Sequence, residues 1–511
     1  MKGWKSFCSQ VKIDQFKLDQ LKELAKANFQ EYQVYPDSLQ SAAGSLFFIA
    51  RENGNKFLVI LSQGAFPAKF AGSEVTLENG KAKVCELTNA NCDALRELFP
   101  YTKPKNHRGL PITVGLGDRL GLASPGHIRL IKDLPVFPIL AQQSIRELNL
   151  TGRTYPDVLA AASWAVFQEG YTKGFGADGD HLKTAEEVKM ALDCGFTMIT
   201  LDCSEHIDNP VAALSAKEIA DRYQMLPQDV RGKLEAKYLG KTFDLKGVSI
   251  TFNQADFEKI VLVYLKAINY TIDLYNKLIK NYSRKIDFEM SIDETLTSTS
   301  PESHFFVAAE LIDGGLEVTS LAPRFCGEFQ KGIDYIGELP QFTKEFVAHF
   351  KIAEHFGYKI SVHSGSDKFA VFPVIGKETG GKYHLKTAGT NWLEAVRVIA
   401  AKNPALYRRM HQFALENLAE ARKYYHISAD PARVPDINKL RDSELPGLMD
   451  LVDSRQVLHI TYGLILLAKN PDGTSTFRKE IYDTLNQFEA DYYAVLERHI
   501  GKHLKLLGVM Q

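Results

Sequence analysis

The 511-residue sequence predicts an α/β protein, a (β/α)8 barrel of the TIM type with a small N-terminal α+β domain and a helical C-terminal extension. The main observation is a repeated pattern after residue 112, in which a short apolar or β-branched run ends in polar residues and a helical pattern follows. This alternation is typical of βα units. Eight such runs occur before about residue 390, and a closed barrel of this kind has eight strands.

The N-terminal domain is expected over residues 1–107. Two apolar runs, SLFFIAREN and GNKFLVILSQ, meet at Asn53-Gly54, and an Asn-Gly pair between such runs is the strongest short hairpin signal. Helical patterns lie on both sides, in DQFKLDQLKELAKANFQEY and NCDALRELF. Proline, glycine and charged residues in YTKPKNHRGLP indicate the linker that ends this domain.

The barrel is expected over residues 108–390, followed by helices that pack on it over residues 391–511. The connection after the fourth strand is long, so residues 209–250 are predicted to be an insertion, and Asn253 is a possible cap of the next helix. The eight predicted strands lie in residues 112–121, 135–144, 172–183, 196–206, 285–295, 316–325, 358–368 and 382–390.

Composition excludes several classes of function. The chain has 61 basic and 62 acidic residues, a net charge of −1, and no basic stripe, so a nucleic-acid partner is not expected. No window approaches the roughly 20 apolar residues of a membrane helix, and the opening MKGWKSFCSQVK lacks a signal-peptide pattern. A cytoplasmic protein without a membrane partner is therefore expected. The six scattered cysteines are expected to be buried apolar groups, and no feature indicates an oligomeric state.

Polar residues at the strand ends are candidates for the active site, because active sites of such barrels lie at the C-terminal ends of the strands. In KIDFEMSIDET, side chains alternate so that Asp287, Glu289 and Asp293 share the face expected to line the lumen. Burying a carboxylate costs several kcal/mol unless it is paired or bound to a metal. A salt bridge to a lumen cation such as Arg324 or Lys386 is the structural alternative to a functional role.

Two further strand ends carry imidazole groups. The third run ends in Asp178, Asp180, His181 and Lys183, and His363 lies on the lumen face of the seventh. Two histidines beside carboxylates favour a divalent metal, and zinc, manganese, cobalt, nickel and iron suit such ligands equally. The alternatives are a polar turn that caps the following helix and a hydrogen-bonded core histidine.

Ten blocks along the chain resemble a known family. In order, these blocks are GDRLG, FPILAQQS, TGRTYPDVLAAASWAVFQEGY, FGADGDHLK, FTMITLDCSEH, FEMSIDET, RFCGEFQKGIDYIG, KISVHSGSDKF, HLKTAGT and YHISAD. From about residue 108 onward, the sequence resembles the bacterial tagaturonate epimerases of hexuronate catabolism. The resemblance implies an isomerase that interconverts D-tagaturonate and D-fructuronate, ketose acids derived from hexuronates, and that depends on a divalent metal cation.

The resemblance also implies roles for residues in three blocks. In FGADGDHLK, it makes Asp180 the proton acceptor and His181 a metal ligand. In FEMSIDET, it makes Glu289 the proton donor, and in KISVHSGSDKF it makes His363 a second metal ligand.

The third metal ligand and the substrate contacts are further expectations. Glu328 in RFCGEFQKG is taken as the third ligand, with Asp293 or Gln330 as alternatives. A basic group should bind the C6 carboxylate of the substrate. The residues expected to bind the substrate are Lys183, Arg324, Ser364 and Lys368.

The substrate's chemistry restricts the mechanism. Counted from the CH2OH end, the ketone is C2, the carboxylate is C6 and the two sugars differ at C4. Since C4 is β to both carbonyl groups, enolisation does not invert it. A base can instead take the C4 hydroxyl proton, so that the C3–C4 bond breaks to an enediolate and a three-carbon aldehyde acid, which rotates and adds back. A divalent cation is expected to stabilise the enediolate.

Three alternatives remain. Transient oxidation at C4 by bound NAD is disfavoured because GLGDRLG, at residues 115–121, departs from the dinucleotide-binding spacing. A metal-dependent aldolase or isomerase would share the retro-aldol step, and product analysis distinguishes it. A non-catalytic sugar-acid sensor would not need Asp180 and Glu289, and both are present.

Overall fold

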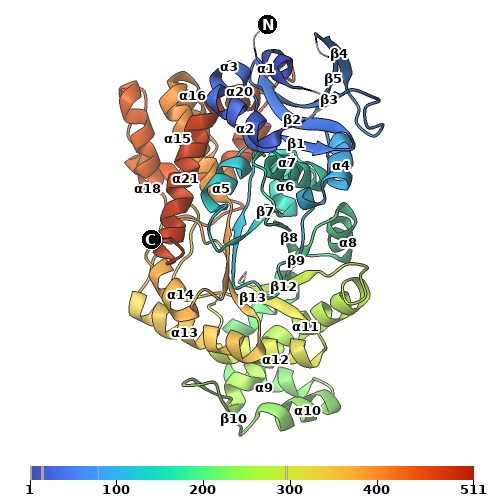
Figure 1. Ribbon diagram of the computed structural model, residues 1–511. Coiled ribbons are helices and arrows are strands. Elements are labelled where there is room, and N and C mark those ends of the chain that lie inside the picture. The colour runs from blue at the N-terminus through green and yellow to red at the C-terminus, as the bar shows by residue number, and fades with distance from the viewer. Residues whose placement is uncertain (1–2, 13–15, 79, 294, 296, 511) are drawn as a thin grey trace.

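The centre of the computed structural model is a closed barrel of eight parallel strands, in the order β12-β13-β14-β15-β6-β7-β8-β9 (Figure 1). The structure describes the chain except for residues 1–2, 13–15, 79, 294, 296 and 511. The barrel confirms the predicted (β/α)8 class, and each strand lies within one of the eight predicted runs. The strands are β6 (Ile112–Leu116), β7 (Phe137–Gln143), β8 (Gly176–Leu182), β9 (Met198–Asp202), β12 (Asp287–Ile292), β13 (Val318–Pro323), β14 (Lys359–Val362) and β15 (Tyr383–Thr387).

Strand β12 shows how the alternating pattern is used. Phe288, Met290 and Ile292 belong to the apolar core between the barrel and its helices, whereas Glu289 faces the lumen. Both faces of the barrel strands are buried, as is usual for parallel sheets covered by helices. Helices around the barrel include α5 (Ser124–Ile131), α6 (Ile145–Thr151), α7 (Tyr155–Gln168), α8 (Ala185–Cys194), α11 (Gln254–Leu278), α12 (Pro301–Asp313), α13 (Leu339–Phe356) and α14 (Phe372–Thr379).

The N-terminal region, blue in Figure 1, is built on a five-stranded antiparallel sheet in the order β1-β2-β3-β5-β4. Asn53 and Gly54 form the predicted hairpin turn, and both have positive φ, as a type I′ turn requires. One face of the sheet packs on Trp164 and Phe167 of α7. The elements of this region are α1 (Trp4–Gln10), α2 (Leu18–Ala27), α3 (Phe29–Tyr32), β1 (Gln40–Ala42), β2 (Ser45–Glu52), β3 (Asn55–Ser62), β4 (Ser73–Leu77), β5 (Gly80–Glu86) and α4 (Asn89–Leu98).

The predicted insertion after β9 forms a separate helical layer. It contains α9 (Ala216–Gln224), α10 (Gln228–Tyr238) and a hairpin of β10 (Thr242–Asp244) and β11 (Ser249–Thr251). Tyr238 packs against Phe257 of α11 and Phe306 of α12, which attaches the insertion to the outside of the barrel at the bottom of Figure 1. Asn253 caps α11 by accepting a hydrogen bond from the backbone N–H of Asp256.

Helices after β15 form the C-terminal region, which has its own apolar core. These helices are α15 (Gly389–Lys402), α16 (Pro404–Glu416), α17 (Leu418–Ala421), α18 (Val452–Ile460), α19 (Tyr462–Leu467), α20 (Arg478–Gln487) and α21 (Glu489–Leu506). Among the described helices, none is both long and apolar enough to cross a bilayer.

The C-terminal helices hold the loop after β14 in place through Asp367. Its carboxylate lies 2.8 Å from an Nη atom of Arg455 and 2.5 Å from Nε2 of His499. His503 accepts a hydrogen bond from the Asp367 backbone N–H and donates one to the His499 carbonyl, so both of its ring nitrogens are used. Asp367, His499 and His503 lie close enough together to resemble a metal site. Because both ring nitrogens of His503 already form hydrogen bonds, we interpret these contacts as structural.

Candidate active site

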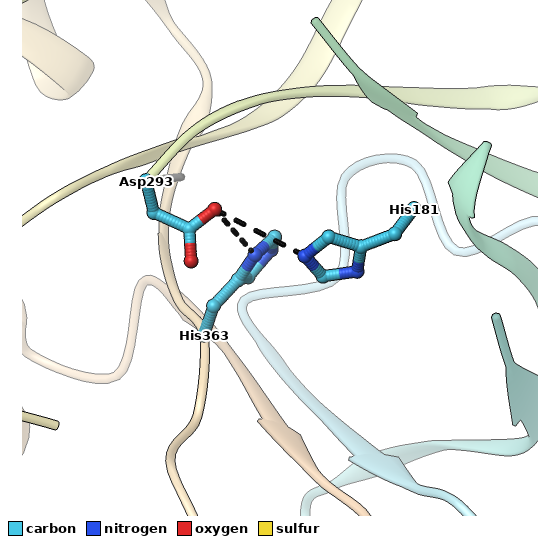
Figure 2. Close-up of side chains that lie close together, drawn as sticks. All are labelled: His181, Asp293 and His363. Carbon is cyan, nitrogen blue, oxygen red and sulfur yellow. Dashed lines mark ion pairs between the residues drawn. The ribbon is translucent and has the colours of Figure 1, made fainter. Parts of the chain in front are cut away.

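His181, Asp293 and His363 come together at the C-terminal end of the barrel (Figure 2). Oδ1 of Asp293 lies 3.3 Å from Nδ1 of His363 and 4.0 Å from Nε2 of His181, and the two imidazole rings are 4.8 Å apart. The three residues follow or end β12, β14 and β8, so the barrel itself brings them together. His181 and the neighbouring Ser364 have φ values of 53° and 50°, a sparsely populated conformation that often marks functional sites.

The donor set of this cluster fits a divalent metal. Two imidazole nitrogens and a carboxylate oxygen, with room for further ligands, are typical of catalytic zinc and related sites. Nδ1 of His363 is buried and forms no hydrogen bond with any described residue, as expected of a ring nitrogen reserved for a ligand.

The other ring nitrogen of each histidine is held by a predicted catalytic carboxylate. Nε2 of His363 lies 2.7 Å from Oε1 of Glu289, and Nδ1 of His181 lies 2.8 Å from Oδ1 of Asp180. Such carboxylate–imidazole contacts orient metal-binding histidines. Asp180 and Glu289 are therefore adjacent to the metal-binding cluster from two sides.

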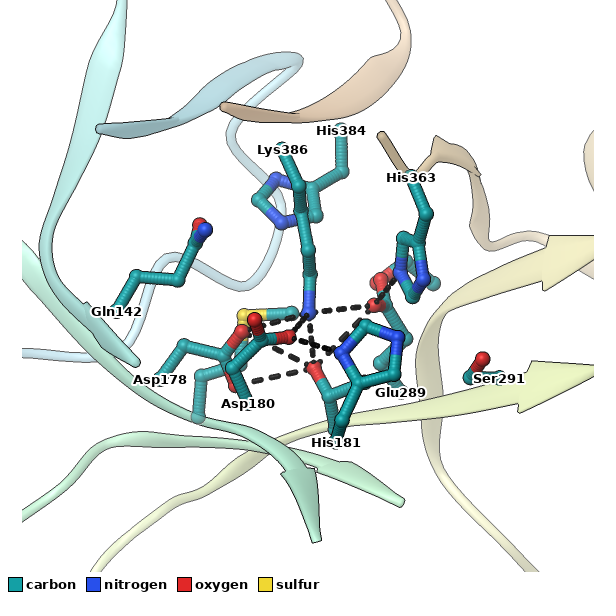
Figure 3. Close-up of polar contacts among 12 residues, drawn as sticks. Gln142, Asp178, Asp180, His181, Glu289, Ser291, His363, His384 and Lys386 are labelled. Atoms are coloured by element: carbon teal, nitrogen blue, oxygen red, sulfur yellow. Dashed lines mark hydrogen bonds and ion pairs between the residues drawn. The ribbon is translucent and has the colours of Figure 1, made fainter. Parts of the chain in front are cut away.

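Lys386 lies at the centre of the lumen among buried acids (Figure 3). Its Nζ is 2.7 Å from Oδ2 of Asp178, 2.6 Å from Oδ1 of Asp180 and 3.0 Å from Oε1 of Glu289. It also donates a hydrogen bond of 2.5 Å to Thr200. The single ammonium group thus balances part of the charge of three carboxylates that come from two different strands.

These contacts shift the pKa values of the acids in different directions. Burial would raise the pKa of Asp180, but Lys386 and His181 outweigh it and hold that pKa well below its usual range. The pKa of Glu289 is likewise held low, by Lys386 and His363 against burial. Burial dominates at Asp178 and raises its pKa to about 6. Asp180 and Glu289 are therefore both ionised. Asp180 is free of a proton and can accept one, although its low pKa makes it a weak base, and Glu289 must first receive a proton before it can donate one.

Two adjoining cavities open above this cluster. The inner one is lined by Asp180, His181 and Lys386, and the outer one, of about 360 Å³, by Arg324 and Glu328 among others. The residues that line both are Arg146, Asp293, Gln330, Lys331, His363, Ser364 and Tyr425. A volume of this order suits a small-molecule substrate.

Four of the residues expected at the site lie together in it, namely Asp180, His181, Glu289 and His363. Ser364 lines both cavities and Arg324 lines the outer one. Glu328 is exposed, binds Gln330 and lies 3.9 Å from His426, outside the cluster of potential metal ligands. Asp293, which was given as an alternative third ligand, lies within that cluster.

Lys183 and Lys368 line neither cavity. Nζ of Lys183 lies 3.4 Å from Glu205. Lys368 is buried, and its ammonium donates hydrogen bonds of 2.6–2.9 Å to three backbone carbonyls of neighbouring loops. Because its three donors are used in this way, Lys368 stabilises the loops, and we do not include it in the proposed substrate site.

Sequence reasoning named Lys386 as a lumen cation that could form a salt bridge with the carboxylates of β12, and its contact with Glu289 confirms this. It assigned no role in the reaction to Lys386 and did not single out Lys331, Arg146 or Tyr425. For Lys386 a signal existed, because His384 and Lys386 alternate with apolar residues in KYHLKTAGT as the acids do in β12. Lys331 and Arg146 lie in connections after strands, and Tyr425 lies in the C-terminal region. Periodicity does not place such residues.

The fold and this cluster define a (β/α)8-barrel protein with a polar, potentially metal-binding active site at the C-terminal ends of its strands. The model of the tagaturonate epimerase family matches residues 35–507. The chain belongs to this family, which makes it an enzyme of the isomerase class and disfavours the aldolase and sensor alternatives.

Individual relatives agree with the family assignment. The chain is 42% identical to the tagaturonate/fructuronate epimerase of Thermotoga maritima over 93% of its own length and 97% of that protein. It also resembles the fructuronate-tagaturonate epimerase of Cohnella laeviribosi. One glycerol-bound crystal structure of that protein gives a TM-score of 0.92 at 50% identity, over 96% of this chain and 100% of the other. The native structure gives 0.91 at 52% identity, over 93% and 96%.

Proposed function

We propose that this protein interconverts D-tagaturonate and D-fructuronate by inverting C4 in a metal-dependent retro-aldol and aldol reaction. The substrates are those in the names of its relatives. The observation that carries the mechanism is the pairing of two histidines, both directed at Asp293, with two carboxylates that can move protons.

His181, Asp293 and His363 would hold the metal. When bound, a divalent cation supplies Lewis-acid stabilisation of the negative charge that develops on the C2 and C3 oxygens. The protein holds both imidazoles in the orientation that this requires through Asp180 and Glu289.

Asp180 acts as the base that removes the proton from the C4 hydroxyl. Its carboxylate lines the inner cavity and is ionised, and Lys386 keeps it in position. The C3–C4 bond then breaks, and its electrons remain on the C3 side as the enediolate, while C4 becomes an aldehyde.

Glu289 is ionised at rest, so the proton that Asp180 removed passes to it through Lys386, whose Nζ contacts both carboxylates. Glu289 then donates this proton to the C4 oxygen after the aldehyde has rotated and C3 has added back to its other face. It comes from β12 and Asp180 from β8, so the two groups approach from different sides of the lumen. Because the reaction is reversible, each carboxylate takes the other's role in the opposite direction.

The test uses purified protein that is stripped with EDTA and then restored with zinc, manganese, cobalt or nickel. Incubation with tagaturonate is expected to form fructuronate only after metal is restored, as measured by liquid chromatography. Full activity of the stripped protein would contradict the metal requirement. Absence of fructuronate with every metal would contradict the proposed reaction, and released three-carbon products would indicate an aldolase.

A further inference from the structure

Lys331 is a buried cation in the wall of the two cavities. It lies in the loop after β13 and lines both cavities, and its Nζ donates a hydrogen bond of 2.8 Å to Ser364. Among the described residues, it forms no ion pair with a carboxylate. Burial, and then the guanidinium groups of Arg146 and Arg119, lower its pKa. An anion bound beside it would favour its charged form and oppose both effects.

The surrounding wall carries excess positive charge. Arg119 lines the inner cavity only, and its Nη1 has no hydrogen-bond partner among the described residues. Its charge is already partly balanced, because it is paired with Glu147 at 2.7 Å and its guanidinium lies 3.8 Å from the ring centre of Tyr462. Arg146 is exposed, lines both cavities and lies 5.0 Å from the ring centre of Tyr425. Lys331 and Arg146 are therefore the cationic groups best placed to meet an anionic ligand.

The remaining wall of the inner cavity carries the proposed metal ligands and the base Asp180, which is already paired with Lys386. Asp180 and Asp293 line it, and Glu289 lies directly behind His363. The acids of that wall are already paired with Lys386 or assigned to the metal, whereas Lys331 has no carboxylate partner among the described residues and would attract the substrate carboxylate. The two walls thus orient a molecule that has a carboxylate at one end and oxygen atoms suited to a metal at the other.

We propose that Lys331, with Arg146 and the Ser364 hydroxyl, binds the C6 carboxylate of the substrate and sets the preference for sugar acids over neutral ketoses. This inference rests on the proposed function, because it identifies the anchor for the substrate named there. C6 is only two bonds from C4, whose hydroxyl must reach Asp180. The anchor must therefore line the same cavity as Asp180, which Lys331 and Arg146 do and Arg324 does not.

The test compares two ligands that cannot react. Altronate is the acid formed when the ketone of tagaturonate is reduced to an alcohol, and altritol is its neutral counterpart. Calorimetry on metal-loaded protein is expected to show that altronate binds more tightly than altritol. Lys331→Met should lower the affinity for altronate by about 10- to 100-fold, as expected for the loss of a charge-assisted hydrogen bond. The affinity for altritol should stay unchanged.

Three variants complete the test. Lys331→Arg keeps the positive charge and should restore most of the preference for altronate. Arg146→Met should show a smaller, altronate-selective loss, because this side chain is more exposed. Lys377→Met, on the surface helix α14 beside Glu378, is the matched control and should bind both ligands as the wild type does.

The inference would be overturned if Lys331→Met lowered the affinities for both ligands equally, or lowered neither. A wild type that does not prefer altronate would also overturn it, as would loss of the preference in Arg324→Met but not in Lys331→Met. Failure of the proposed function is seen separately, because a wild type that forms no fructuronate can still bind altronate through Lys331.

Discussion

Nζ of Lys386 lies 2.6 Å from Oδ1 of Asp180, so an ammonium group from β15 meets the proposed base at the end of β8 inside the lumen. The same ammonium also contacts Glu289 at 3.0 Å and thereby links both proposed proton-transfer groups. The low pKa values of both carboxylates depend on this lysine, because burial alone would raise them.

Replacing Lys386 with Met should impair both stability and turnover. Three buried carboxylates would lose their common cation, and breaking a buried ion pair in this way typically costs about 3–5 kcal/mol. We expect a lower urea midpoint and a kcat reduced by about 100-fold or more, since Asp180 would then tend to be protonated. A variant that is destabilised but keeps wild-type kcat would limit Lys386 to a structural role.

Asp180→Asn should abolish turnover and leave the metal bound. The amide is close in shape to the carboxylate and can still contact His181, but it cannot accept the C4 hydroxyl proton, a loss of roughly 100- to 10,000-fold in general base catalysis. Steady-state kinetics and metal analysis of the same preparation check this. Wild-type turnover in this variant would assign the base to another residue.

Asp293→Asn should lose metal, whereas Glu328→Gln should retain it. Asp293 lies between the two histidines, and Glu328 lies outside the cluster. Loss of a direct ligand should lower affinity by more than the roughly 10- to 100-fold that loss of an outer partner costs. Metal titrations of both variants compare them directly. The opposite pattern would restore Glu328 as the third ligand, and His363→Ala serves as the metal-free reference.

Lys359, at the start of β14, should make stability rise with pH. Burial lowers its pKa from 10.5 to about 7, although Asp287 and Glu289 oppose the shift. Between these values the unfolded chain binds more protons than the folded one, so alkaline pH favours folding. Relative to Lys359→Met, the wild type should gain about 2 kcal/mol in the free energy of unfolding between roughly pH 7.5 and pH 9.5, measured with urea. A difference that is flat or falls with pH would contradict this.

The fold could be predicted because each barrel strand carries a local signal. Apolar alternation in KIDFEMSIDET, for example, determines which side of β12 faces the helices, and closure of the barrel then brings Glu289, His181 and His363 together. The same alternation in β15 places Lys386 on the lumen face. Its partners Asp180 and Glu289 lie far away in the sequence, so the alternation does not identify them.

Residues in loops could not be placed in this way. Glu328, Lys331 and Lys368 all follow barrel strands, but the path of each loop depends on contacts that periodicity does not encode. Lys368 turns inward to backbone carbonyls, Glu328 turns outward to Gln330, and Lys331 reaches Ser364. The proposed third metal ligand and the proposed carboxylate anchor were therefore the least predictable parts of the site.

The most direct test of the proposed mechanism is NMR of the metal-restored protein with tagaturonate in D2O. Inversion by cleavage and re-addition of the C3–C4 bond keeps the original hydrogen on C4, so fructuronate should form without deuterium at that carbon. Deuterium at C4 would mean that the C4–H bond is broken, and it would contradict the proton-transfer roles proposed for Asp180 and Glu289.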